Sequence, residues 1–355
     1  MSEDDAATAS PRTSRTLRSI IQQVLPGVVT LVVVAAGARL LAPYVPVTPL
    51  LLAVAVGAVV ANTVGVPDAL EPGIALHALL LETGIVLLGA SVSLAALVAA
   101  GPQLLLAVVA VVAVGLLLVE LLARVAGLRR RTGSLLAAGS AICGVSAVAA
   151  TAGALDADES DVALAAGTVL TFDAVTLAVY PGIATTLALD PRVFGVWAGL
   201  SMFSTGPVTA AGFAYHPVAG EWATVTKLAR NALIGVVAVA YSLRAAAGSD
   251  ESAETDAAST GGIRGTVAAL AEGLPKFLVG FVAVAALANA GLIAGPARET
   301  LVVASDTLFL LAFAGLGFDI RADQMRAAGV RPLVVVGVAF LAVSGTAYLL
   351  ASGLF

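Results

Sequence analysis

The stretch AGSAICGVSAVAATAG, residues 138–153, is built almost entirely from small side chains, although long apolar runs lie on either side of it. A helix that only has to lie in lipid is better built from Leu, Ile and Val. Small residues let backbones approach closely, and glycine tolerates a break in a helix. The stretch therefore predicts either a broken helix or an unusually close helix contact.

The composition indicates a membrane protein, because 59% of the 355 residues are hydrophobic and only 12% are charged. A soluble domain has about 25% charged residues. Apolar runs of about 20 residues recur along the chain without period-two alternation, which favours transmembrane helices over barrel strands. The expected fold class is therefore an all-α polytopic membrane protein with about 10–11 transmembrane helices.

The predicted helices fall into two parts separated by a polar linker. We expect a disordered cytoplasmic N-terminus at 1–19, a first membrane part at 20–243, an acidic Ser-rich linker at 244–273 and a second membrane part at 274–355. The predicted spans lie near 21–41, 48–64, 77–99, 102–123, 133–154, 162–188, 193–214, 222–243, 274–294, 299–318 and 332–354. The break at Gly206-Pro207 leaves the number open between ten and eleven.

The distribution of positive charge supports this layout, since Lys and Arg gather in cytoplasmic loops. With the N-terminus in the cytoplasm and the C-terminus outside, most of the 18 Lys and Arg residues lie inside, including Arg129, Arg130 and Arg131. The acidic loop DADESD, residues 156–161, falls outside in this layout. We therefore expect a multi-pass protein of a prokaryotic inner membrane.

Two faint internal repeats are visible. The segment GASVSLAALVAAG (89–101) is similar to GFDIRADQMRAAG (317–329), and Ala61-Asn62 upstream is similar to Ala288-Asn289. Seven predicted spans separate these copies, so they should have opposite orientations, as in many secondary transporters. The opening stretch is similar to AGLSMFSTGPVTAAGF (198–213), but the predicted spans make that pair parallel. With these predicted spans, no single symmetry accommodates both repeats.

Breaks near Gly144 and Gly206-Pro207 would create helix N-termini at membrane depth. Free N–H groups and the positive end of the helix dipole form an anion site without a charged side chain. The alternative is that the small residues only allow close helix packing. The candidate substrate-binding residues are Ser140, Ala141, Ile142, Cys143, Gly144, Val145, Ser146, Ser201, Ser204, Thr205, Thr209, Lys227 and Arg230.

Lys227 and Arg230 lie three residues apart, and so on one face of a helix, in GEWATVTKLARNALIG (220–235). Charged side chains within a span usually face a cavity or a partner. These two could offset the charge of a bound anion. Alternatively, they could reach the membrane interface or form a structural pair with an acid such as Asp173.

Three intramembrane acids are candidates for ion coupling: Asp173, Glu82 and Asp306. Asp173 lies in the middle of a span and is the strongest candidate for carrying a proton or binding a cation. Glu82 and Asp306 lie near the starts of the two repeat copies, where an acid could instead stabilise a helix N-terminus.

The sequence offers little for catalysis. Cys143 has no neighbouring histidine, His77 and His216 do not have the spacing of zinc ligands, and no GxxxxGK[ST] phosphate loop is present. We therefore expect no enzyme activity, no catalytic residues, no metal and no cofactor. The expected partners are a small anionic solute, membrane lipid and a proton or sodium ion, with a homodimer as an option and no nucleic acid.

The segment LAAGSAICGVSAVAA (136–150) resembles the signature of the YeiH-type sulfate exporter family. FGVWAGLS (194–201), ATVTKLARNALIG (223–235) and AFAGLGFDIRADQMRAAGVRPL (312–333) extend the resemblance over nearly the whole chain. The resemblance implies about ten or eleven helices, an architecture related to bile-acid and sodium–proton transporters, and discontinuous helices that cross at mid-membrane. The name of the family implies sulfate as the expected substrate.

One departure from the family pattern is notable. Many relatives have S-I-H-E-V-A-Q where this chain has SMFSTGP (201–207), so Phe203 and Ser204 occupy the His and Glu positions. The coupling chemistry of the relatives need not apply here. The expected function is a secondary active exporter of a small anion such as sulfate or a sulfonate. A sodium-coupled organic-acid transporter, a passive anion channel and an intramembrane enzyme or sensor are the alternatives.

Overall fold

The computed structural model describes residues 17–45, 47–246 and 276–355, and within them it contains helices and no strand. Seven helical segments of the described chain are long and apolar enough to cross a membrane. The all-α polytopic fold class is therefore confirmed. The predicted disordered segments, 1–19 and 244–273, lie almost wholly outside the described residues.

The α-helices, in chain order, are α1 (Leu17–Leu41), α2 (Pro49–Thr63), α3 (Glu71–Ile74), α4 (His77–Leu88), α5 (Leu94–Val125), α6 (Arg130–Ala141), α7 (Val145–Ala152), α8 (Glu159–Thr186), α9 (Pro191–Ser201), α10 (Thr205–Tyr215), α11 (Pro217–Asn231), α12 (Ile234–Ala246), α14 (Lys276–Asn289), α15 (Pro296–Asp319), α16 (Ala322–Ala327) and α17 (Val330–Leu354). Short 3-10 turns follow α1 (η1, Ala42–Tyr44) and α7 (η2, Gly153–Leu155).

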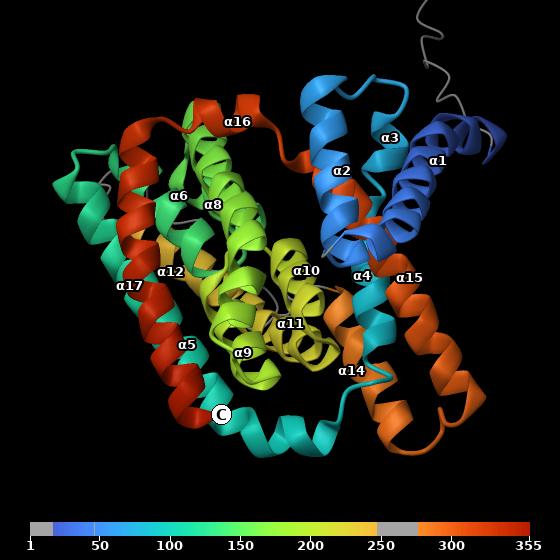
Figure 1. Cartoon of the computed structure of the whole chain (residues 1–355). Helices are drawn as coiled ribbons and strands as arrows, with labels where there is room; N and C mark the ends of the chain where they lie inside the picture. The colour runs from blue at the N-terminus through green and yellow to red at the C-terminus, as the bar shows by residue number, and fades with distance from the viewer. Residues whose placement is uncertain (1–16, 46, 247–275) are drawn as a thin grey trace, which may run out of the picture.

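The helices form two groups, which lie side by side in Figure 1. In the first, called here the α15 bundle, α15 packs against α2 and α4, while α1 packs on α2 and α3 and α14 on α4. Backbones approach closely through glycine: a Cβ on Gly57 would collide with the α15 backbone at Ala314 and Gly317. Such small-residue contacts are the usual way for helices to pack within a bilayer.

The second group, called the hairpin bundle, contains α5 to α12 and α17. Its two long helices α5 and α17 pack on each other, α6 packs on α5 and α8, and α11 packs on both α9 and α10. Between α4 and α5, and again between α15 and α17, the chain passes from one bundle to the other.

Residues 130–152 form a re-entrant hairpin, so the predicted crossing span at 133–154 is wrong. Helix α6 enters the bundle, the chain turns at Ile142–Gly144, and α7 returns alongside α6. The two open ends of the hairpin meet, because Arg131 pairs with Asp156 at 3.3 Å and Thr132 hydrogen bonds to Asp161. The prediction that the acidic loop 156–161 lies across the membrane from Arg129–Arg131 is wrong for the same reason.

Residues 191–215 form a second re-entrant hairpin, which replaces the predicted span at 193–214. Helices α9 and α10 are joined by a turn at Met202–Ser204. At the open end, the Tyr215 hydroxyl donates to the Leu189 carbonyl, and the rings of Phe194 and Tyr215 are 4.8 Å apart. The longest of the four hairpin helices, α6, has 12 residues. It is therefore about 18 Å long, too short for a bilayer core of about 30 Å.

The two hairpins enter from opposite ends of α8, which connects them. The first hairpin is tied to Asp161 near the start of α8, and the second is tied to Leu189 just beyond its end. The similarity between 138–153 and 198–213 therefore relates two segments of opposite orientation. The predicted parallel relationship came from counting each hairpin as a crossing, and the corrected topology makes both internal repeats inverted.

The other repeat is visible as a reciprocal pair of asparagine contacts. Asn62, at the end of α2, donates to Ile320 O at 2.6 Å and accepts from Ala322 N at 2.7 Å. Asn289, at the end of α14, donates to Val92 O at 2.9 Å and accepts from Leu94 N at 3.2 Å. Asn62 of the first copy thus holds the linker that follows Gly317 in the second copy. Asn289 of the second copy holds the linker that follows Gly89 in the first.

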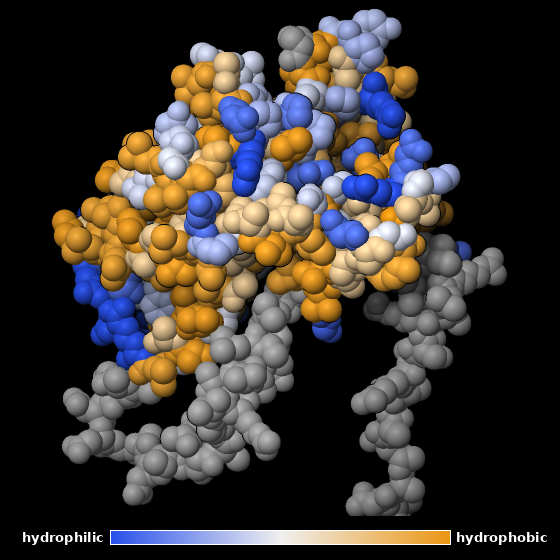
Figure 2. All heavy atoms as spheres, turned by 90° about the horizontal axis from the view of Figure 1, so that it is seen from below, coloured by the Kyte–Doolittle hydropathy of each residue, from blue (hydrophilic) through white to orange (hydrophobic). Residues whose placement is uncertain are grey.

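The surface is largely apolar. Figure 2 shows hydrophobic residues over most of the face at the C-terminal end of α17, with hydrophilic side chains in separate groups. Leu106 and Leu117 on α5 are 67% and 73% exposed, and Leu341 on α17 is 72% exposed. Exposed leucines along the length of such helices are expected where the helices face lipid.

Candidate functional site

The tips of the two hairpins meet inside the hairpin bundle. Gly144, between α6 and α7, has a φ of 71°, a conformation that residues with a side chain rarely adopt. A Cβ at this position would also collide with the hydroxyl of Ser204 at the other tip. Glycine is therefore required twice at this position, by the turn and by the contact between the tips. This explains the glycine in the middle of the small-residue stretch 138–153.

Each tip presents the C-terminal end of one helix, and two cations from α11 bind there. The Lys227 ammonium donates to Ile142 O at 2.5 Å and to Met202 O at 3.1 Å, which are the C-cap residues of α6 and α9. Both C-terminal ends carry partial negative charge, and a cation between them stabilises both. The ammonium therefore bridges the two hairpins.

Arg230 has the same role one turn further along α11. Its guanidinium donates to Ser140 O and Ala141 O (the latter at 2.6 Å) on the first hairpin, and to Leu200 O and Met202 O at 2.8 Å on the second. Lys227 and Arg230 are both 0% exposed. Neither reaches the membrane interface, and among the described residues neither pairs directly with a carboxylate.

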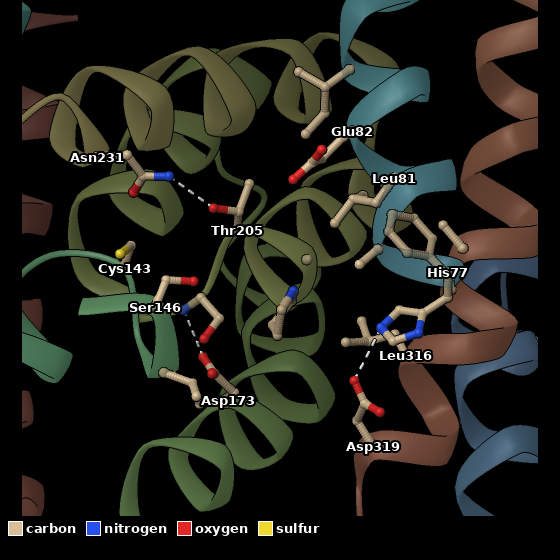
Figure 3. Close-up of a pocket in the computed structure, with 18 of the residues that line it drawn as sticks. His77, Leu81, Glu82, Cys143, Ser146, Asp173, Thr205, Asn231, Leu316 and Asp319 are labelled. Atoms are coloured by element: carbon tan, nitrogen blue, oxygen red, sulfur yellow. Dashed lines mark hydrogen bonds and ion pairs between the residues drawn. The ribbon is translucent and has the colours of Figure 1, made fainter. Parts of the chain in front are cut away.

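The N-terminal ends of the two returning helices face a cavity of about 370 Å³ that lies between the bundles (Figure 3). Val145 and Ser146 begin α7, and Thr205 and Gly206 begin α10; all four residues line the cavity. The first N–H groups of a helix have no partner within it. None of these four N–H groups makes a hydrogen bond within the described residues. Four residues whose N–H groups are unpaired within the described chain therefore line one cavity, two from each returning helix.

Two buried polar side chains complete this wall. Asp173, on α8, accepts the Ser204 N–H at 2.9 Å through one carboxylate oxygen, while the other oxygen has no partner among the described residues. Asn231, on α11, donates to Thr205 Oγ1 at 3.0 Å, and its amide oxygen is likewise without a partner there. Both residues line the cavity and are at most 4% exposed.

The opposite wall belongs to α4 and α15 of the α15 bundle. Figure 3 shows Glu82, Leu81 and His77 on one helix and Leu316 and Asp319 on the other. His77 Nε2 lies 3.0 Å from Asp319 Oδ2, and its Nδ1 lies 3.0 Å from the Ile74 carbonyl oxygen. A hydrogen on each ring nitrogen, as in the imidazolium ion, satisfies both acceptors. The remaining lining is apolar and includes Ile85, Phe277 and Phe313.

The structure brings about half of the predicted site residues together. Those that line the cavity are Cys143, Val145, Ser146, Ser204, Thr205, Asp173 and Glu82. The side chains of the others do not line it: Ser140, Ala141, Ile142, Gly144, Ser201, Thr209, Lys227, Arg230 and Asp306. The Ser140 hydroxyl donates to Leu136 O, the Ser201 hydroxyl donates to Trp197 O, and Thr209 accepts from Thr224. Asp306 is exposed on α15.

Sequence reasoning missed His77, Asn231 and Asp319. Asn231 directly follows Arg230 and is the last residue of α11, so the motif ATVTKLARNALIG (223–235) already contained it. His77 was considered only as a zinc ligand. Its pairing with Asp319 joins α4 to α15 across 242 positions of sequence, and no local pattern predicts such a contact.

The fold and this cavity define a multi-pass α-helical membrane protein with two opposed re-entrant hairpins. The family described as Conserved hypothetical protein 698 matches residues 26–336. The chain belongs to this family of UPF0324 membrane proteins, which confirms the resemblance to the YeiH-type family.

Similar proteins span almost the full length of the chain. A UPF0324 membrane protein of Nitratidesulfovibrio vulgaris is 33% identical over 321 residues, which cover 87% of this chain and 88% of the relative. TauZ of Paracoccus pantotrophus, also a UPF0324 membrane protein, is 30% identical over 337 residues, covering 92% and 94% of the two chains. No solved structure gives a significant match.

Proposed function

We propose that this protein is a secondary active transporter of a small organic or inorganic anion. The carrying observation is that the first two residues of α7 and of α10 line one cavity and that their four N–H groups make no hydrogen bond within the described residues. Two helix N-termini contribute positive potential as well as donors, which is the arrangement that binds sulfate, phosphate or carboxylate groups. The negative C-terminal ends of α6 and α9 are already bound by Lys227 and Arg230 and do not oppose the anion.

The substrate class follows from the other surfaces of the cavity. Its volume of about 370 Å³ exceeds that of a bare sulfate ion, and Leu81, Phe313 and Leu316 give it an apolar side. A sulfonate would place its anionic group at the helix N-termini and its carbon chain against these residues. We therefore favour a sulfonate over inorganic sulfate, with export as the direction implied by the family resemblance.

Coupling to a proton is assigned to Asp173. Asp173 lines the cavity beside the N–H groups proposed to bind the anion, and one of its carboxylate oxygens has no partner among the described residues, so an ionised carboxylate there would repel an anion. Protonation removes this repulsion and provides a donor. Proton and anion binding are thereby linked, and replacing Asp173 with Asn should remove the pH dependence of transport. An unchanged pH profile in this variant would exclude Asp173 from coupling.

The position of the cavity between two bundles suits alternating access, in which one bundle moves against the other. Arginines gather at the end of the molecule that carries α16, including Arg129, Arg131, Arg244 and Arg321. This bias favours a cytoplasmic location for that end. The N-terminus is then cytoplasmic and the C-terminus outside, in a prokaryotic inner membrane.

Binding of anions by the purified protein tests the proposal, with thermal unfolding as the readout and sulfate, ethanesulfonate and acetate as probes. Thr205→Pro removes one of the four N–H groups at the first position of α10, where proline is well tolerated, and Ser204 already has the extended backbone that precedes proline. The loss of one charge-assisted hydrogen bond is worth about 1.5–3 kcal/mol, or about a tenfold to a hundredfold weaker affinity.

The matched control is Thr205→Val, which loses the hydroxyl bonded to Asn231 but keeps the N–H group. It should bind the probe anion nearly as well as the wild type. Equal binding by the proline variant and the wild type would refute the anion site. Counterflow in proteoliposomes then separates a transporter, which shows it, from a passive channel, which does not.

A further inference from the structure

We propose that Lys227 and Arg230 are resident cations that occupy the cation site of the hairpin crossing, so that transport needs no sodium ion. The inference rests on the proposed function and extends it to the coupling ion. In transporters with broken helices, the C-terminal ends of half-helices and neighbouring carbonyls commonly coordinate Na⁺. Here those carbonyls bind the chain's own side chains.

The carbonyl oxygens come from both hairpin tips and surround the two cations. Ser140, Ala141 and Ile142 provide three of them from the first hairpin. Gly199, Leu200 and Met202 provide three from the second, and Met202 O accepts from both cations. A Na⁺ ion would need several of these same oxygens as ligands. They are already hydrogen bonded to groups that carry a full positive charge.

The charges of the cluster are consistent with this role. The ends of a helix behave approximately as half an elementary charge each, positive at the N-terminus and negative at the C-terminus. The two C-terminal and two N-terminal ends at the crossing therefore cancel one another. Lys227 and Arg230 leave two positive charges, and ionised Asp173 offsets one of them. The crossing as a whole then favours an anion and disfavours a further cation.

Sodium titration of the purified protein tests this inference directly. Thermal unfolding is measured in sodium gluconate and in N-methyl-D-glucamine gluconate at constant ionic strength, without any probe anion. We expect the wild-type midpoint to be the same in both salts, because a ligand stabilises a protein only when it binds the folded state. A midpoint that rises with sodium concentration in the wild type would overturn the proposal.

Lys227→Met provides the converse experiment, because it vacates the place between Ile142 O and Met202 O. This variant should be less stable than the wild type and should gain a sodium-dependent rise in its midpoint. The control is Lys276→Met, which removes the lysine at the exposed start of α14 and should give no sodium response. A folded Lys227→Met protein that is indifferent to sodium would also overturn the proposal.

Two further points keep the tests separable. If Lys227→Met does not fold, the wild-type sodium titration alone decides the question. A separate titration with ethanesulfonate in glucamine salt tests the anion site. If the wild type bound no ethanesulfonate and showed no sodium effect, the proposed function would be contradicted and the cation assignment would stand. If sodium stabilised the wild type and anion binding were intact, the cation assignment would be contradicted and the proposed function would stand.

Discussion

The two bundles differ sharply in what they bury. Of the polar and charged side chains that are buried in the described residues, all but Ser305 belong to the hairpin bundle. In the α15 bundle the helices are held by apolar side chains and by glycine contacts such as Gly57 against Gly317. The comparison shows that the α15 bundle has an almost wholly apolar interior, while the hairpin bundle buries the polar and charged groups on which the proposed function rests.

Arg230→Met should give the largest loss of stability, and it tests the contrast between the two bundles. It keeps an unbranched side chain of similar length but leaves the buried carbonyls of Ser140, Ala141 and Leu200 without donors. Each such acceptor costs about 1–3 kcal/mol, so we expect the free energy of unfolding to fall by at least about 3 kcal/mol. Unfolding by SDS in mixed micelles measures the change.

The matched control lies in the other bundle. Ser305→Ala removes a buried hydrogen bond of 2.8 Å to Gly84 O and should cost only about 0.5–1.5 kcal/mol. If the two variants were equally destabilised, the buried polar cluster would have no special weight in the fold.

Gly144→Ala should have the next largest effect, because the added carbon meets both a positive φ and the Ser204 hydroxyl. The left-handed conformation alone costs about 1–2 kcal/mol for a residue with a side chain. The collision between the tips adds to that and should also displace Ser204 N–H from Asp173. We expect weaker anion binding together with a lower thermal midpoint.

Gly127→Ala separates the two causes. Gly127 has a φ of 68°, and no atom lies within 4 Å of the position of an added Cβ. This variant should lose only the conformational part, about 1–2 kcal/mol, and should bind the probe anion normally. An equal loss of anion binding in both variants would show that contact between the tips is unimportant.

The smallest expected effects come from Asn62→Ala and Asn289→Ala. Each removes two hydrogen bonds to a linker between the bundles, at exposed positions, so each should cost about 1 kcal/mol. Because the contacts are reciprocal, the two costs should be similar, and they should add in the double variant. Thr63→Ala, which loses only a hydrogen bond within α2, is the control for unfolding measurements.

Much of the fold could be predicted from local sequence features. Apolar run length gave the helical membrane class, and the small-residue stretch 138–153 and Gly206-Pro207 gave the two breaks. The inverted repeat was visible in the matched positions of Asn62 and Asn289. These features are local in sequence, so a single chain is enough to reveal them.

The direction of the chain after each break could not be predicted in the same way. A re-entrant hairpin and a broken crossing have the same length and apolar character, and only contacts between their ends distinguish them. Opposite charges at Arg131 and Asp156 were a usable signal for the first hairpin. For Lys227 and Arg230, the sequence left a bound anion, the membrane interface and a pair with Asp173 as alternatives. It gave no sign that helix carbonyls would be their partners.

The bonds of Lys227 and Arg230 also bear on how the chain is made. Their acceptors on the first hairpin lie 85 to 90 positions earlier in the sequence. During synthesis, the first hairpin is therefore complete well before α11 leaves the ribosome, and its tip carbonyls lack their final donors. The first hairpin can reach its final hydrogen bonding only after α11 has entered the membrane, so this stage of assembly must follow translation of the second hairpin.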